Sequence, residues 1–588
     1  MTRLGRGLIG LSVLGLLAHP TVFGQVVSGQ IDSLKQLIKE VEKSANELPQ
    51  SKRRALSSGM QNLLQLAASL NRTGKETADE LPLLDRARTA SSLRARSQHQ
   101  PEREADDSEG IAVSDPSTDF VFSVLAGFTQ SETSTGWCGD NVVVGFNDSG
   151  SVFETLAEGE GGLSFNGYAR SSDRGATFRD LGFLNPGPNP ANFLVGDPVI
   201  GCGNASTFFY SSLFETSDAA GRALSAISVS RSSDGGFTFA DPVIAASRHM
   251  SSAFADGAFL DKSWMAVDPT DPNRLFVTYT NFGLPIISCG LDSAGRPIRG
   301  QRSAIELVRS TDGGANWGTP QVIDETCSPL SVPGLFPQGS QVAVGPAGQV
   351  YVAWEFYRAD FVTREIRFRT SLDRGATFAP FVKVDNVTCV GDCFVIEGGF
   401  RTFLDLQSLA VDRSHGMTRG NIYVAWHDGR NVQAPDLAAR TGMYGFADVL
   451  LSRSSNGGAS WSPAVRVNSN DRLLESGRGT DQYQPGIAVD PRGKVAACFY
   501  DRAGDRFNFF VGRTCAVSEN GGATFSRVRT IETMFAPMHA TDTLINPLYM
   551  GDYDTLASDF TNAHSGFVGA FQVINRRANP DVKAVKVE

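Results

Sequence analysis

The stretch Ser171-Ser172-Asp173-Arg174-Gly175-Ala176-Thr177-Phe178 is the first of six copies of one phrase. The five later copies begin at Ser232, Ser310, Ser371, Ser454 and Val517. Together they follow the pattern S-x-[DN]-x-G-x-[TS]-[FW], slightly relaxed, and the last two carry Asn in place of Asp. A phrase that returns along the chain in this way is typical of a repeat architecture, so it decides the fold.

The residue types of the phrase suit a tight turn between two strands. Its Asp or Asn side chain can accept hydrogen bonds from the amides of the turn. Its glycine can adopt the positive φ that other residues resist, and its aromatic ring can pack against the unit that carries it. Because a turn that recurs in every unit belongs to the scaffold, the phrase predicts the fold and carries no chemistry of its own.

Around each phrase the sequence predicts four short strands. In one unit an apolar stretch at 264–268 is followed by a turn at Pro269 and a second strand at 275–279. A third strand runs into the phrase at Ser310, and a fourth follows it at 320–323. Short apolar runs between Gly, Pro, Asp and Asn turns are typical of strands. Four antiparallel strands per unit, repeated around an axis, form a β-propeller.

Aligning the inner strands on their small central residues gives seven starting points. They lie at residues 132, 197, 261, 338, 405, 483 and 552. We therefore predict an all-β, seven-bladed β-propeller preceded by a short α-helical segment, with six blades as the alternative. The last blade would take two strands from the C-terminal part, at about 553–559 and 566–574, and Phe120 to Phe128 would supply an outer strand that closes the ring.

The first residues predict export. Arg3 and Arg6 precede a short apolar core at 8–18, and a cleavage site before Gln25 makes 1–24 a signal peptide. The apolar run is too short to span a membrane, and no later stretch is long enough to be a transmembrane segment. We expect a secreted or periplasmic protein, with a membrane-tethered N-terminus as the alternative.

After the predicted signal peptide, the sequence first shows apolar residues at helical spacing and then a polar, charged stretch. Apolar residues recur at helical spacing at 31–48 and again at 56–70, with Pro49 between them. Two such helices can pack on each other, on the propeller or on a partner protein. A charged, Ser-rich stretch of low apolar content follows. The sequence thus predicts a helical hairpin segment at 25–85, a flexible linker at 86–118 and the propeller at 119–588.

The net charge restricts the kinds of binding partner, and the cysteine content indicates the compartment in which the protein resides. A net charge of −10 argues against nucleic acid or an anionic membrane as a partner. An even number of cysteines, eight, favours disulfides in an exported chain. A metal site at the cysteines is the weaker interpretation, because no His lies at ligand spacing. The expected pairs are Cys498 with Cys515, Cys289 with Cys327, and Cys389 with Cys393.

The six phrases resemble the Asp boxes, or bacterial neuraminidase repeats, of the sialidase-like propeller superfamily. The resemblance covers roughly residues 119–575 and is specific for the superfamily rather than for one member. Asp boxes occur in sialidases, in other glycan hydrolases and lyases, and in propellers without known catalysis. The resemblance therefore implies a glycan or glycoconjugate as the partner.

Candidate site residues follow from propeller geometry. Loops that enter the inner strand, and loops between the second and third strands, surround one mouth of the central channel, which is the default binding site. Residues at inner-strand starts include Asp197, Gln338 and Asp481, and residues at second-strand ends include Asn147, Asp148 and Asn281. From this set we predict catalytic roles for Asp261, Asp405, Asp428, Tyr500 and Asp501, and substrate-binding roles for Lys262, Glu355, His427, Arg430, Arg502, Asp552 and Tyr553.

Several chemistries fit a mouth rich in carboxylates. Two carboxylates across a glycosidic bond can act as acid and as base or nucleophile. Clustered carboxylates can also hold Ca²⁺, the one cofactor considered, although no cofactor is required. The alternative interpretation is that these Asp residues cap turns and bond to the amides of neighbouring blades, and that Asp428 with Arg430 is a structural ion pair.

The sialidase pattern itself is not found. Sialidases hold a carboxylate with three arginines, the first in an F/Y-R-I-P phrase before the first Asp box. This chain has no Arg between Arg103 and Arg170, and Arg296-Pro297-Ile298-Arg299 lies after the second phrase. Tyr549 or Tyr553 resembles the late sialidase Tyr only weakly without those arginines.

Two functions from different classes follow. The first is a propeller that binds or processes a glycan at its mouth by hydrolase or lyase chemistry. The second is a non-catalytic binding or assembly module of the cell envelope, whose N-terminal helices dock a protein partner.

Overall fold

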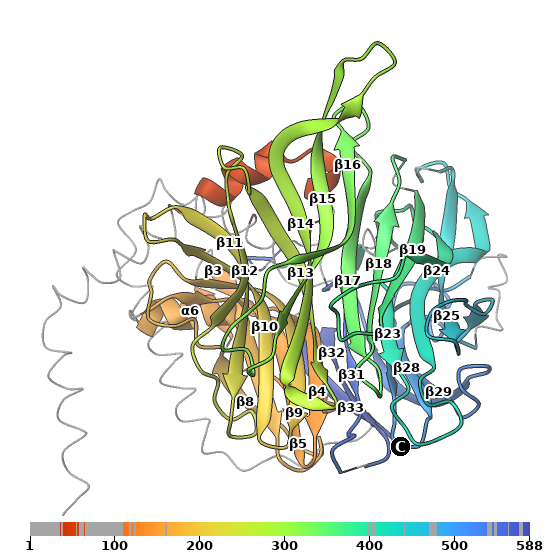
Figure 1. Ribbon diagram of the computed structural model, residues 1–588. Coiled ribbons are helices and arrows are strands. Elements are labelled where there is room, and N and C mark those ends of the chain that lie inside the picture. Colours follow the sequence, from red (N-terminus) through yellow and green to blue (C-terminus); the bar gives the residue numbers. More distant parts are fainter. Residues whose placement is uncertain are drawn as a thin grey trace, which may run out of the picture.

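The chain forms a ring of seven small antiparallel sheets around a central axis, so the predicted all-β, seven-bladed propeller is confirmed (Figure 1). Each blade has four strands in simple up-and-down order, and a short parallel strand is added to the second blade. The residues described by this computed structural model are 36, 39–54, 56–57, 61, 64, 110–116, 119–122, 125–158, 161–360, 362–397, 400–401, 406–439, 441–469, 479–537, 542, 544–545, 550–562, 564–574 and 580–588.

The first four blades are continuous in the chain. Blade 1 comprises β4 (Gln130–Cys138), β5 (Asn141–Asp148), β7 (Asn166–Ser171) and β8 (Arg179–Phe183). Blade 2 comprises β9 (Phe193–Asn204), β10 (Thr207–Ser217), β11 (Ala223–Ser232) and β12 (Val243–His249), with β6 (Leu163–Ser164) beside β9. Blade 3 comprises β13 (Ala258–Asp268), β14 (Asp271–Leu291), β15 (Pro297–Ser310) and β16 (Gln321–Pro329). Blade 4 comprises β17 (Phe336–Val344), β18 (Val350–Tyr357), β19 (Thr363–Ser371) and β20 (Val382–Thr388).

The last three blades follow in order, and the seventh combines both ends of the propeller. Blade 5 comprises β23 (Ser408–Val411), β24 (Ile422–Pro435), β25 (Met443–Ser454) and β26 (Val465–Arg466). Blade 6 comprises β27 (Gln482–Val489), β28 (Val495–Asp501), β29 (Val511–Ser518) and β30 (Ser526–Phe535). Blade 7 comprises β31 (Leu556–Ala557), β32 (Phe567–Ile574), β33 (Pro580–Val587) and β1 (Ile111–Ala112). Smaller elements are α3 (Gln50–Arg54), α6 (Ser149–Glu158), β2 (Phe120–Phe122), β3 (Leu125–Gly127), β21 (Val395–Ile396) and β22 (Phe400–Arg401).

The apolar core lies between neighbouring blades. Val143 and Tyr168 of blade 1, for example, pack in one buried cluster with Ile200 and Tyr210 of blade 2. The inner strand β27 is buried along its whole length, because blades cover it on both sides. Burial of this kind explains why the inner strands are nearly continuous apolar or small-residue runs rather than alternating ones.

The repeated phrase forms the same turn between the third and fourth strands of six blades. In the first copy the amide of Gly175 donates to Ser171 Oγ (2.8 Å), and the amide of Thr177 donates to Asp173 Oδ1 (2.9 Å). The other five copies repeat both bonds, with Asn456 and Asn520 replacing Asp in the last two. The predicted hydrogen bonding of the turn amides is therefore confirmed.

Glycines of the repeated turns lie close to the preceding blade, most tightly in blades 2 and 5. A Cβ added to Gly236 of blade 2 would lie 2.1 Å from Val143 Cγ2 of blade 1, and one added to Gly458 of blade 5 would lie 2.1 Å from Phe368 Cε1 of blade 4. Gly175 of blade 1 faces Val568 of blade 7 in the same way. Only glycine fits so close an approach at a positive φ. The turn therefore packs against the neighbouring blade and also connects two strands of its own blade.

The ring is closed by a different segment from the one predicted. Residues Ile111 and Ala112 of β1 pair with Ala584 and Lys583 of β33 and form the outer strand of blade 7. The predicted outer strand, Phe120 to Phe128, instead contains the two-stranded hairpin β2–β3. The prediction was wrong because blade 7 takes three strands, rather than two, from the C-terminal part. Only one strand position, at the outer edge, was left for the N-terminal side, and the short β1 fills it.

All eight cysteines are paired. The three expected pairs are present, and the fourth joins Cys138 of β4 to Cys202 of β9, so that it links blades 1 and 2. Four disulfides are typical of an oxidising compartment. Within the described residues, no helix is both long and apolar enough to cross a membrane.

A helical segment from the N-terminal region lies across one end of the ring, drawn in red in Figure 1. Residues 39–47 are helical, Pro49 follows the end of that helix, and α3 comes next. Val41, Ala45, Leu48 and Leu56 are buried in the same apolar cluster as Phe259 and Phe336 of the propeller. The predicted apolar stripe thus packs, in its described part, against the propeller.

The buried amine of Lys52 in this segment destabilises the folded protein when it carries its charge. Lys52 is fully buried, its Nζ lies 3.5 Å from the backbone oxygen of Gln301, and burial lowers its pKa to about 7. The folded protein therefore gains stability as the pH rises from 7 towards 10.5, where an unfolded Lys still holds its proton. We expect Lys52→Met to stabilise the protein by about 1–4 kcal/mol at pH 7. Urea unfolding at pH 7 and pH 10 checks this: the gain should shrink at pH 10, and equal gains at both pH values would contradict it.

Candidate functional site

The inner strands begin at the end of the ring opposite the repeated turns, and five of them carry a β-bulge there. We call this end the mouth. One residue with positive φ lies in each bulge: Glu132 (53°), Asp197 (55°), Lys262 (51°), Gly339 (69°) and Gln484 (56°). Bulges re-aim side chains and recur next to active sites. The five bulges coincide with the predicted inner-strand starts, or follow them by one residue.

Two buried carboxyl groups meet at the mouth. Asp261 and Asp197 are both fully buried. Asp261 Oδ2 accepts hydrogen bonds from the amide of Ser57 (2.7 Å) and from Gln338 Nε2 (2.8 Å), whereas its Oδ1 has no hydrogen-bond partner. Burial, and then repulsion from Asp197, raise the pKa of Asp261 to about 7. Asp261 can therefore hold or release a proton near neutral pH.

A cation and an aromatic ring lie beside this pair. The Lys262 ammonium is 3.5 Å from the ring centroid of Tyr553 and 5.1 Å from that of Trp264. The Tyr553 hydroxyl donates to the backbone oxygen of Pro198 (2.7 Å), which fixes the ring. Because Lys262 belongs to blade 3 and Tyr553 precedes the inner strand of blade 7, their contact spans the axis of the ring. Asp261, Lys262 and Tyr553, all predicted site residues, are thus brought together.

A third set of contacts joins blades 1 and 7 to the N-terminal segment. Arg401 pairs with the carboxylate of Asp552, and its Nη1 donates to the backbone oxygen of Leu56 (3.3 Å). The amide of Asp552 in turn donates to Glu132 Oε1 (2.8 Å). Asp552, a predicted binding residue, therefore lies at the mouth next to a guanidinium that the sequence analysis did not select.

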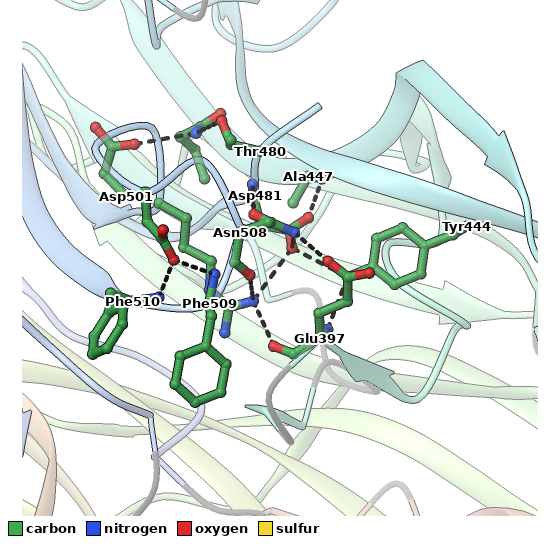
Figure 2. Close-up of polar contacts among 12 residues, drawn as sticks. Glu397, Tyr444, Ala447, Thr480, Asp481, Asp501, Asn508, Phe509 and Phe510 are labelled. Atoms are coloured by element: carbon green, nitrogen blue, oxygen red, sulfur yellow. Dashed lines mark hydrogen bonds and ion pairs between the residues drawn. The ribbon is translucent and has the colours of Figure 1, made fainter. Parts of the chain in front are cut away.

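A second polar cluster lies at the mouth side of blades 5 and 6. Figure 2 shows Tyr444, Asn508 and the amide of Ala447 converging on Asp481. Arg502, a predicted binding residue, is fully buried here: it lies 3.5 Å from Asp481 Oδ2 and donates to the backbone oxygens of Glu397 and Asn508. The contacts hold loops of blades 5 and 6 together.

Tyr500 and Asp501 lie next to that cluster and are held by structural hydrogen bonds. The Tyr500 hydroxyl donates to the backbone oxygen of Gln572 (3.1 Å), and burial raises the pKa of this phenol well above its ordinary value. Asp501 accepts from Gln482 Nε2 (3.1 Å) and Thr514 Oγ1 (2.7 Å). Neither side chain contacts the Asp197–Asp261 pair in any described hydrogen bond.

The remaining predicted residues make contacts within or between blades, or lie outside the described residues. Asp428 accepts from Arg430 Nε (2.8 Å) and from the amide of Thr388 (3.2 Å), so this ion pair joins blade 5 to the outer strand of blade 4. His427 Nδ1 accepts from the amide of Gln484 (3.2 Å). Glu355 is buried opposite Gln338 in the strand ladder. Asp405 lies outside the described residues.

Several charged groups at the mouth were missed by the sequence analysis. They are Arg401, Glu215, Arg513 and Asp554. Burial raises the pKa of Glu215 well above its ordinary value. Arg513 lies near the start of a third strand and Asp554 comes two residues after a predicted site residue, so extending the selection to third-strand starts would have found Arg513. Nothing in the local sequence marks Arg401.

The carboxylates of the mouth do not form an evident metal site. Among the described residues, no group of three or more His, Cys, Asp or Glu side chains is arranged to hold a metal ion. Behind the mouth the channel holds a cavity of about 410 Å³, lined by the inner strands of all seven blades. Arg413 is the one charged residue in that lining, and its guanidinium lies 4.5 Å from the ring centroid of Phe560.

Comparisons with known proteins give only distant structural likenesses. No protein-family model matches the chain, and no curated protein sequence matches it. Among solved structures, a Hadza microbial sialidase is 14% identical with a TM-score of 0.37, over 66% of this chain and 65% of that one. A polysaccharide lyase described as an ulvan lyase is 10% identical with a TM-score of 0.45, over 82% and 96%. An α-L-arabinanase of Penicillium chrysogenum is 10% identical with a TM-score of 0.39, over 82% and 98%.

Proposed function

We propose that this propeller binds a glycan at its mouth and cleaves it, with Asp261 as the proton donor and Asp197 as the second carboxylate. The observation that carries the proposal is the fully buried Asp261 carboxyl, whose pKa is raised to about 7 beside Asp197. Glycan-cleaving sites of this kind need one carboxylic acid that stays protonated near neutral pH and one carboxylate that acts as base or nucleophile.

The neighbouring groups suit a sugar. Trp264 supplies a partly exposed aromatic ring, and Lys262 and Arg401 supply hydrogen-bond donors for hydroxyl or carboxylate oxygens. The resemblance of the repeated phrase to Asp boxes supports the same class of ligand. A secreted or periplasmic location fits four disulfides and the predicted leader.

A second candidate function is a non-catalytic binding or assembly module of the cell envelope. It is favoured by the internal hydrogen bonds that three carboxylates of this region accept, those of Asp481, Asp501 and Asp428. In this case the N-terminal helices would dock a protein partner. Binding of a glycan without release of any product would support the module.

The test of the enzymatic proposal is a pH profile of sugar release on a panel of polysaccharides. Activity should fall as the pH rises through about 7, because Asp261 then loses the proton that it donates. Asp197→Asn removes the second carboxylate, so sugar release should fall by about 10²–10⁴-fold.

The matched control is Asp173→Asn, which lies in a repeated turn at the far end of the ring. Two other copies of that turn already carry Asn, at 456 and 520, so the profile should not change. Sugar release by Asp197→Asn at the wild-type rate would contradict the proposed pair of carboxylates. Wild-type activity that does not fall as the pH rises through about 7 would contradict the assignment of Asp261 as the proton donor.

A further inference from the structure

The N-terminal segment reaches into the centre of the mouth. Leu56 and Ser57 are fully buried, although they lie 204 or more residues from their partners in the propeller. The amide of Ser57 donates to Asp261 of blade 3, and the oxygen of Leu56 accepts from Arg401, which also pairs with Asp552 before blade 7. Blades 3 and 7 stand across the ring from each other, so the peptide between Leu56 and Ser57 bridges the axis.

This peptide unit presents one acceptor and one donor on adjacent atoms. Its carbonyl oxygen faces Arg401, and its N–H faces Asp261. Two neighbouring hydroxyl groups of a sugar offer the same pair of functions, since each hydroxyl can accept or donate. A carboxylate that accepts from one hydroxyl, beside a guanidinium that donates to the next, would therefore hold a vicinal diol as it holds the peptide.

We propose that the Leu56–Ser57 peptide unit occupies the subsite in which the protein binds the vicinal diol of a sugar, so that the N-terminal segment is an intramolecular competitor of the glycan. The proposal rests on the proposed function and adds the ligand chemistry of the Asp261–Arg401 subsite and its regulation. Displacement of the segment opens the subsite, and any condition that tightens its docking closes it.

The contacts that hold the segment are numerous enough for competition. Besides the apolar residues, Gln301 Nε2 donates to the backbone oxygen of Glu47 (3.1 Å), and Ser51 Oγ donates to that of Pro333 (3.2 Å). The guanidinium of Arg54 lies 5.3 Å from the ring centroid of Phe394. A ligand must therefore displace a docked peptide, which reduces its apparent affinity by the fraction of molecules in which the mouth is open.

The experiment compares three full-length proteins. Leu56→Asp places a charge at a fully buried apolar position near Asp261 and Asp552, and should release the segment from the mouth. Ser57→Pro is the milder variant, because it introduces no charge: it removes the N–H that donates to Asp261 together with the Ser57 hydroxyl. Gln50→Asp is the matched control, since it adds the same charge at an exposed position of α3.

The first readout is hydrogen–deuterium exchange at residues 258–268 and 551–557, and the second is binding to a panel of neutral oligosaccharides. We expect faster exchange and at least about tenfold tighter binding for Leu56→Asp and Ser57→Pro, with Gln50→Asp equal to the wild type. A synthetic peptide covering residues 39–61 should compete with the sugar on Leu56→Asp.

Three results overturn all or part of the inference, and each points to a different part of it. If exchange shows an open mouth while the variants bind the same sugars with wild-type affinity, the segment is no competitor, although glycan binding itself stands. If the opened variants bind no oligosaccharide at all, the proposed glycan function fails, and the diol subsite fails with it. Oligosaccharides without a vicinal diol that bind the opened mouth equally well overturn the subsite alone.

Discussion

Asp261→Asn is expected to abolish cleavage and at the same time to stabilise the protein. Both hydrogen bonds to Asp261 go to Oδ2, so the amide oxygen of Asn can accept both. Its NH₂ takes the place of Oδ1, which has no hydrogen-bond partner among the described residues. The Asn side chain cannot donate a proton to a leaving group, which should lower the rate of sugar release by about 10²–10⁴-fold.

The stability gain follows from the sign of the pKa shift. The pKa of Asp261 is about 7 in the folded protein and 3.8 ordinarily, so the folded protein binds more protons than the unfolded chain between these values. Its stability therefore falls as the pH rises from 4 to 7, and Asn escapes that loss. We expect a gain of about 2–4 kcal/mol at pH 8 and about 1 kcal/mol or less at pH 4.5.

Urea unfolding at these two pH values, together with the sugar-release assay, checks both halves of the prediction. Asp261→Asn should lose activity and gain stability, whereas a variant that is inactive because it misfolds would lose both. Asp173→Asn should change neither quantity, since its carboxylate lies in an exposed turn. Equal stability of the wild type and Asp261→Asn at both pH values would show that Asp261 does not hold its proton near neutral pH.

Asp554→Ala is expected to destabilise the ring strongly. Asp554 Oδ1 accepts from the amide and the hydroxyl of Thr133 in blade 1, and Oδ2 lies 3.5 Å from Arg513 Nη1 in blade 6. Both charged side chains are at most 2% exposed. Removing the carboxylate leaves a buried guanidinium without its counter-charge, which typically costs about 3–5 kcal/mol.

A double-mutant cycle separates the charge pair from the packing. Asp554→Leu alone and Arg513→Met alone should each destabilise, because the partner is then an unpaired buried charge. The double variant with both of these substitutions removes both charges and should recover much of the loss. The free energy of unfolding from urea titrations measures each variant. Additive losses in the double variant would mean that the two groups do not stabilise each other.

The periodic parts of the fold were predictable from the sequence, because they are local. Ser171, Asp173 and Gly175 make the bonds of their turn within a few residues, and six copies of that pattern fixed the number and order of most blades. The seventh blade was found because its inner strand repeats the spacing of the others. Its outer strand was misplaced, because a two-residue strand such as β1 has no pattern that distinguishes it.

The candidate site was predictable only in part, for a physical reason. Strand order places Asp261, Lys262 and Tyr553 at one end of the ring, and this can be derived from the repeat. Whether a side chain then meets the axis or a neighbouring loop depends on the bulge that precedes it and on distant segments. Arg401 and Ser57 join the mouth through contacts across 151 and 204 residues, which no local pattern records.

The repeated turns also bear on the order in which the ring assembles. The turns contact the preceding blade, so the blades can pack onto one another in sequence from blade 2 to blade 6. Blade 7 has no such turn, and its fourth strand must wait for Ile111 to meet Ala584. That encounter joins the two ends of the propeller, so its loop-closure entropy is larger than that of any blade hairpin. We therefore expect closure of the ring to be a late step of folding, because it depends on this long-range contact.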